Sequence, residues 1–79
     1  MTSIHFPNNL LALETAWQQT YEDMARQPPG TGTTTHRRRL LNLDRAISAH
    51  PFWAQPGRSP AARVELRLQA RALRWVEAA

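Results

Sequence analysis

Residues 9–26 read NLLALETAWQQTYEDMAR and carry the clearest helical pattern in this chain of 79 residues. The large apolar residues recur at spacings of three and four: Leu10, Leu13, Trp17, Tyr21 and Met24. At about 100° per residue these side chains fall on one narrow arc of a helix. Asn8 or Asn9 is expected to cap its start, and two prolines after Gln27 end it. The stretch therefore predicts an amphipathic helix with one buried face.

A second helical pattern follows at residues 34–49. Three aliphatic residues and two histidines share one face, in the order His36, Leu40, Leu43, Ile47 and His50. A threonine among residues 33–35 is expected to cap this helix, and Pro51 ends it. The arginine triplet at 37–39 lies in its first turn, where the helix dipole favours anions. These guanidinium groups therefore need water or an acidic partner.

A third helix is predicted at residues 60–77. Ser59-Pro60 is a typical start signal, because serine caps free N–H groups and proline fits the first helical position. Two apolar arcs run side by side along it, the first with Val64, Leu68, Ala72 and Trp75, the second with Leu66, Leu73 and Val76. A face this wide predicts a helix wedged between two others.

The three patterns predict an all-α fold, a small three-helix bundle with proline-containing connections and a single helical domain over residues 1–79. Ile4, Phe6 and Pro7 are expected to fold back over the bundle end. The expected interior residues are Leu13, Trp17, Tyr21, Leu40, Leu43, Ile47, Val64, Leu68, Leu73 and Trp75. So short a chain leaves no room for a second domain or a deep substrate cleft. With so small a core, a homodimer that pairs or swaps the same faces stays open.

Composition sets further limits on the function. The chain has no cysteine, which excludes disulfides and thiolate chemistry. Its longest uncharged apolar run, Leu10–Leu13, is far shorter than the ~20 residues that span a bilayer, and no signal-peptide pattern precedes it. We therefore expect a cytoplasmic protein. All ten basic residues are arginine, for a net charge of +4; the arginine and alanine enrichment also matches a GC-rich bacterial genome.

The linker at residues 28–34, PPGTGTT, resembles the phosphate-binding loop of ATPases that carry PPGTGKT. That loop needs a lysine where Thr33 stands, a glycine where Gln27 stands, and a preceding strand. Here an amphipathic helix precedes it, so the sequence indicates a helix–helix linker without nucleotide binding.

Catalytic and metal-binding patterns are missing from the sequence. His36 and His50 are 14 residues apart, which places them about 21 Å apart on one helix. Neither they nor His5 belong to a pair with metal-ligand spacing. Glu22 and Asp23 are adjacent and point about 100° apart, so they do not converge on a substrate. We therefore predict a protein that is not an enzyme and holds no metal or cofactor.

Four arginines form a ladder on the predicted third helix: Arg63, Arg67, Arg71 and Arg74. Like charges at this spacing destabilise a helix by about 0.2 to 0.5 kcal/mol per pair, and no acid shares the arc. One interpretation is a solvated face that Glu14, Glu22 and Asp23 partly neutralise. The other is a partner outside the helix.

The preferred partner is a protein with an acidic surface, bound by the arginine ladder and by Phe52 and Trp53 as aromatic anchors. The same two aromatic residues could instead pack back onto the bundle end. The alternative partner is a nucleic-acid backbone, with a secondary basic patch of Arg38, Arg39 and Arg45 extending the footprint. We do not expect a membrane surface, because all three apolar faces are needed inside.

Overall fold

Three α-helices and one short 3₁₀-helix form the computed structural model, which describes residues 4–56 and 59–78. Helix α1 spans Asn8–Ala25, α2 spans Thr34–Ser48 and α3 spans Pro60–Ala78; the 3₁₀-helix η1, Pro51–Ala54, lies between α2 and α3. No strand occurs in these described ranges. The all-α, three-helix prediction is confirmed, and each predicted helix boundary lies within one residue of the observed one.

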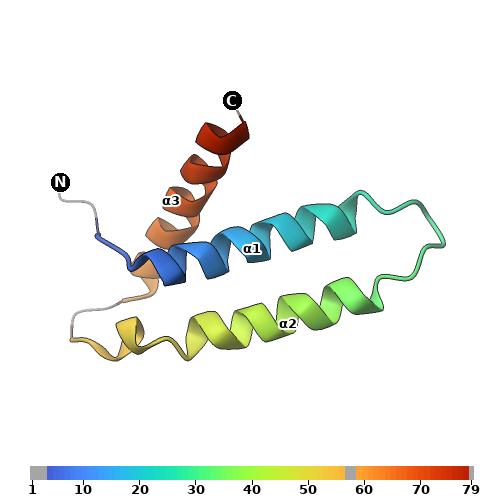
Figure 1. Ribbon diagram of the computed structural model, residues 1–79. Coiled ribbons are helices and arrows are strands. Elements are labelled where there is room, and N and C mark those ends of the chain that lie inside the picture. Colours follow the sequence, from blue (N-terminus) through green and yellow to red (C-terminus); the bar gives the residue numbers. More distant parts are fainter. Residues whose placement is uncertain (1–3, 57–58, 79) are drawn as a thin grey trace.

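Helices α1 and α2 lie antiparallel and side by side, and α3 crosses α1 obliquely (Figure 1). Helix α1 packs against both of the other helices. The molecule measures 45 × 30 × 18 Å, with a radius of gyration of 14.0 Å. A compact chain of this length would have a radius of gyration of about 11.6 Å. The fold is therefore open and flat, with α3 covered mainly on one side.

The helix starts differ from the predicted caps. Pro7 occupies the N-cap position of α1, and its carbonyl accepts hydrogen bonds from Leu10 N and Leu11 N at 3.1 Å. The asparagine cap was therefore a wrong prediction, because the helix already begins at Asn8. Thr33 does stand at the N-cap of α2, but its side chain makes no capping hydrogen bond.

The core lies at one end of the molecule, where the start of α1, the end of α2, η1 and the first half of α3 meet. It consists of Phe6, Leu10, Ile47, Phe52 and Leu66. The rings of Phe6 and Phe52 pack with centroids 5.0 Å apart. Ile4 packs against this cluster, which confirms that the N-terminal segment folds back over the bundle end.

The far end of the α1–α2 pair is thinly packed. Leu40 and Leu43 of α2 are only partly buried. Leu13 is also only partly buried, but it lies near the start of α1 and packs against the core. Trp17 is also partly buried and stacks on Tyr21 with ring centroids 5.5 Å apart, but Tyr21 remains 50% exposed. Tyr21 was therefore wrongly predicted as interior, because α2 covers only one side of α1 at this end.

Helix α3 buries a different face from the one predicted. Its buried residues are Ala62, Leu66 and Ala70, at spacings of four. Four residues predicted as interior are exposed instead: Val64 by 53%, Leu68 by 56%, Leu73 by 43% and Trp75 by 71%. Small alanines on either side of Leu66 suit close packing against a neighbouring helix. Because α3 is not wedged between two helices, the arc with Val64, Leu68 and Trp75 stays outside.

Candidate functional site

Arg63, the first member of the arginine ladder, ties α3 to α2. One Nη is 3.6 Å from Asp44 Oδ1, and the other donates to Ser48 Oγ at 3.4 Å. Its guanidinium also lies over the Trp53 ring, 5.4 Å from the centroid. These contacts stay within the molecule, so Arg63 is largely occupied by its own fold.

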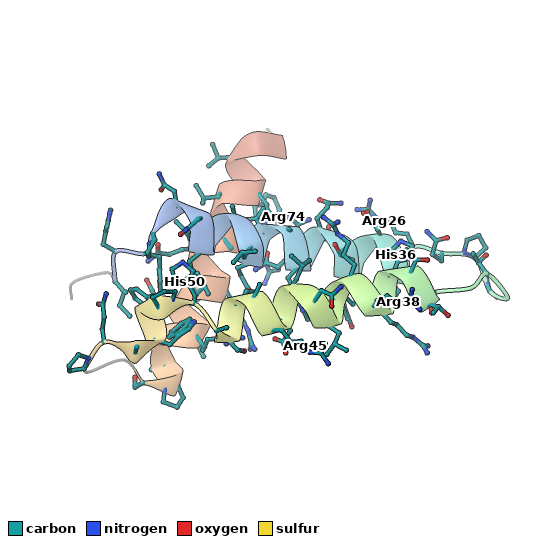
Figure 2. All side chains as sticks on the ribbon, turned by 60° about the horizontal axis from the view of Figure 1, so that its bottom comes forward. Arg26, His36, Arg38, Arg45, His50 and Arg74 are labelled. Carbon is teal, nitrogen blue, oxygen red and sulfur yellow. The ribbon has the colours of Figure 1, made fainter. Side chains whose placement is uncertain are left out.

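Arg74, the last member of the ladder, ties α3 to α1 (Figure 2). It pairs with Glu22 Oε2 and donates to Gln18 Oε1 at 3.4 Å and to Gln19 Oε1 at 3.3 Å. The hydrogen bond from Arg74 lowers the pKa of Glu22 below its ordinary value. The interpretation that Glu22 neutralises part of the ladder is confirmed for this residue.

Glu14 is buried between the helices. Its burial raises the pKa of the carboxyl group, and a hydrogen bond with Gln18 and the charges of Arg63 and Arg67 partly oppose that rise. Glu14 therefore lies in the interior between the helices and adds no acidic group to the outer surface.

Arg67 and Arg71 remain exposed in the middle of α3. Among the described residues neither of them forms a salt bridge. Three exposed apolar residues lie beside them on the same helix, Val64, Leu68 and Trp75, which we name the outer stripe. The structure thus combines two unpaired guanidinium groups with an uncovered apolar surface.

A groove of about 1340 Å³ adjoins the outer stripe, between α1 and the last turns of α3. Helix α1 lines it with apolar residues such as Leu11 and Ala12 and with polar ones that include Gln18 and Glu22. Helix α3 contributes Leu73 and Trp75 together with two ladder arginines, Arg71 and Arg74. Trp75 therefore belongs to both the stripe and the groove, so the two surfaces are continuous.

Phe52 and Trp53 do not form an exposed aromatic loop. Phe52 belongs to the buried core, and its N–H donates to Nδ1 of His50 at 3.1 Å. Trp53 packs against the same core and donates from Nε1 to the carbonyl of Ile47 at 2.7 Å. Both residues follow the alternative interpretation, in which they pack back onto the bundle end.

The secondary basic patch is divided. Arg38 and Arg45 are exposed on the side of α2 that faces away from α1 (Figure 2). Arg39 instead reaches α1, where its Nε donates to Thr20 Oγ1 at 3.0 Å. The structure therefore brings Arg38 and Arg45 to the outer face and uses Arg39 as an internal tie.

The histidines lie apart, with His36 and His50 at opposite ends of α2 (Figure 2). Nε2 of His50 is 3.0 Å from Asn9 Oδ1 and, because Nδ1 accepts from Phe52, it is the donor in this pair. Among the described residues, no three potential metal ligands cluster. Within the same ranges, no helix has the length and apolar character needed to cross a membrane.

The sequence reasoning missed the outer stripe, because it assigned Val64, Leu68 and Trp75 to the core. One signal in the sequence could have found it: Ala62 and Ala70 flank Leu66 at helical spacing and mark a closely packed face. Once that face is assigned to the interior, the other apolar arc of α3 has no neighbour left within the chain.

The chain belongs to the family described as a domain of unknown function, DUF8825, whose model matches residues 9–69. The match covers α1, α2, η1 and the first half of α3. Neither the curated proteins nor the solved structures gave a match.

Proposed function

We propose that this DUF8825 member is a non-catalytic binding protein that docks a protein partner on the outer stripe of α3. The observation that carries the proposal is the exposure of Val64, Leu68 and Trp75 beside the unpaired Arg67 and Arg71. Large exposed apolar side chains that gather on one face mark interaction sites on small proteins. Tryptophan and arginine are also the side chains that most often dominate binding energy at interfaces.

Charge supports a partner with an acidic surface. The chain carries a net charge of +4. Glu14 is buried, Glu22 is paired with Arg74, and in the described part of the chain Arg67 and Arg71 form no salt bridge. Acidic groups on a partner would complement these arginines and favour the correct orientation of the complex. The outer stripe would supply the apolar area that the complex buries.

A nucleic-acid backbone is less well supported as the partner. Two of the four ladder arginines, Arg63 and Arg74, are held by Asp44 and Glu22. Phosphate binding depends on the number of cations that reach the backbone. The apolar residues of the outer stripe would also find no complement along a phosphate chain.

A membrane surface is also less well supported as the partner, although the expectation that every apolar face lies inside was wrong for α3. The outer stripe has three large apolar side chains, and Arg71 lies among them. Binding to lipid scales with the apolar area inserted, and each nearby cation adds only about 1 kcal/mol. So short and interrupted a stripe favours a protein partner.

The test is a pull-down from source-cell lysate with the tagged full chain, carried out with and without nuclease. Leu68→Glu places a charge in the outer stripe; the matched control is Leu41→Glu, since Leu41 is 49% exposed on α2. We expect a nuclease-resistant partner that Leu68→Glu loses and Leu41→Glu keeps, with both variants melting like the parent. Retention of every partner by Leu68→Glu, or release of all of them by nuclease, would contradict the proposal.

A further inference from the structure

The position of Arg71 specifies what the partner must present. Along the outer face of α3 the residues Val64, Leu68, Arg71 and Trp75 follow one another at spacings of four, three and four. This is the spacing at which paired helices pack, and on a straight helix the four positions fall within about 60°. Arg71 therefore lies inside the apolar seam, between Leu68 and Trp75.

A partner that covers this seam must also cover the Arg71 guanidinium. Burying a charge is costly unless an opposite charge and hydrogen bonds meet it. Between Pro60 and Val76 the only acid is Glu65, and its Oε1 already accepts a hydrogen bond from Gln69. Between Pro60 and Val76, therefore, no free carboxylate of α3 is available to compensate Arg71 within the seam.

On the basis of the proposed function, we infer that the partner is an amphipathic helix of another protein with a carboxylate in its own apolar seam, opposite Arg71. A single charged or polar residue in a helix seam sets partner choice and register. A bidentate carboxylate suits the planar guanidinium better than water does. The seam from Val64 to Trp75 is about 16 Å long, which matches about three turns of the partner helix.

A second copy of this chain fits the seam poorly. It would bring its own Arg67 and Arg71 into the interface, where like charges would face one another without a carboxylate between them. Like charges that face one another across an interface weaken binding. The charge pattern therefore favours a different, acidic helix.

Synthetic helical peptides of about 18 residues test the inference directly. They share a leucine seam and differ at one central seam position, which is Glu, Gln or Arg, and calorimetry measures their affinity for the full chain. We expect the Glu peptide to bind at least roughly tenfold more tightly than the Gln peptide. Arg71→Glu should reverse the preference towards the Arg peptide. Arg38→Glu, on the exposed face of α2, should leave the order unchanged.

The outcomes separate this inference from the proposed function. Equal affinity for the Glu and Gln peptides, or no binding of any peptide, would contradict the inference that the partner helix carries a carboxylate opposite Arg71. The proposed function would still stand if the pull-down finds a partner that depends on Leu68. Vesicles of phosphatidylcholine and phosphatidylserine and a short DNA duplex serve as further probes. If either binds through Leu68 and Arg71 and the peptides do not, both proposals are wrong.

Discussion

At the scale of single residues, the pKa values of two glutamates two turns apart on α1 are shifted in opposite directions. Burial raises the pKa of Glu14, whereas the hydrogen bond from Arg74 lowers the pKa of Glu22. The charged form of Glu14 lowers the stability of the folded state, whereas the charged form of Glu22 stabilises the contact between α1 and α3. The dependence of stability on pH therefore contains two contributions of opposite sign.

Glu14→Gln is expected to increase the free energy of unfolding at neutral pH. The folded-state pKa of Glu14 lies above its ordinary value of 4.5, so the folded chain binds this proton more tightly than the unfolded chain. Stability contributed by this group is therefore lost as the pH rises from 4.5 through the folded pKa. Urea unfolding should show the gain at neutral pH and little difference in strong acid. A less stable variant at neutral pH would show that the partly opposing arginine charges outweigh burial.

Arg74→Ala is expected to lower stability at neutral pH. The folded-state pKa of Glu22 lies below 4.5, so its contribution is present above that value and is lost as the pH falls through the folded pKa. Thermal unfolding should therefore show a difference between parent and variant that shrinks in acid. Arg71→Ala is the matched control, because Arg71 is exposed on the same helix and forms no salt bridge in the described chain. Equal melting of the two variants would contradict this account of the Arg74 tie.

At the scale of elements, local chemistry predicted the helix boundaries to within one residue, although the predicted asparagine cap of α1 was wrong. Proline lacks an N–H and fits only the first turn of a helix well, so Pro28-Pro29, Pro51 and Ser59-Pro60 mark helix boundaries in the sequence. The buried face of α3 depends on its neighbour instead. Both arcs are apolar, and close approach to α1 favours the one with small residues around Leu66.

Leu66→Ala and Leu68→Ala separate these two faces of α3. Leu66 is fully buried in the core, so its truncation should cost about 2 to 5 kcal/mol of unfolding free energy. Leu68 is 56% exposed, so the same truncation there should change stability by no more than about 0.5 kcal/mol. Chemical denaturation measures both. A larger loss of unfolding free energy for Leu68→Ala would show that the outer stripe belongs to the core.

The candidate site was only partly visible in the sequence. Helical spacing aligned the four ladder arginines, and Arg67 and Arg71 are indeed exposed. The pairing of Arg63 with Asp44 and of Arg74 with Glu22 joins residues far apart in the chain, so spacing within one helix could not predict it. Phe52 illustrates the same limit, because its burial depends on where Phe6 returns to the bundle end.

At the scale of the whole molecule, the core occupies one end, and the outer stripe of α3 is not covered by another helix of the chain. The radius of gyration of 14.0 Å reflects this arrangement. We expect the isolated chain to remain a monomer, because Arg67 and Arg71 beside the outer stripe oppose pairing with a second copy. Light scattering should give a mass of 9.0 kDa, and small-angle scattering should return the open dimensions. Twice that mass, lost on Leu68→Glu, would show that the stripe pairs with itself.

The most direct test of the central claim places a photo-crosslinking amino acid at Leu68 or, as the control, at Leu41 in the living source cell. Leu68 lies in the outer stripe, whereas Leu41 is similarly exposed on α2. We expect position 68 to form a covalent adduct with a different protein that nuclease does not remove, and position 41 to form no such adduct. Adducts that are identical at both positions, that contain nucleic acid or a second copy of the chain, or that fail to form at position 68 would contradict this expectation.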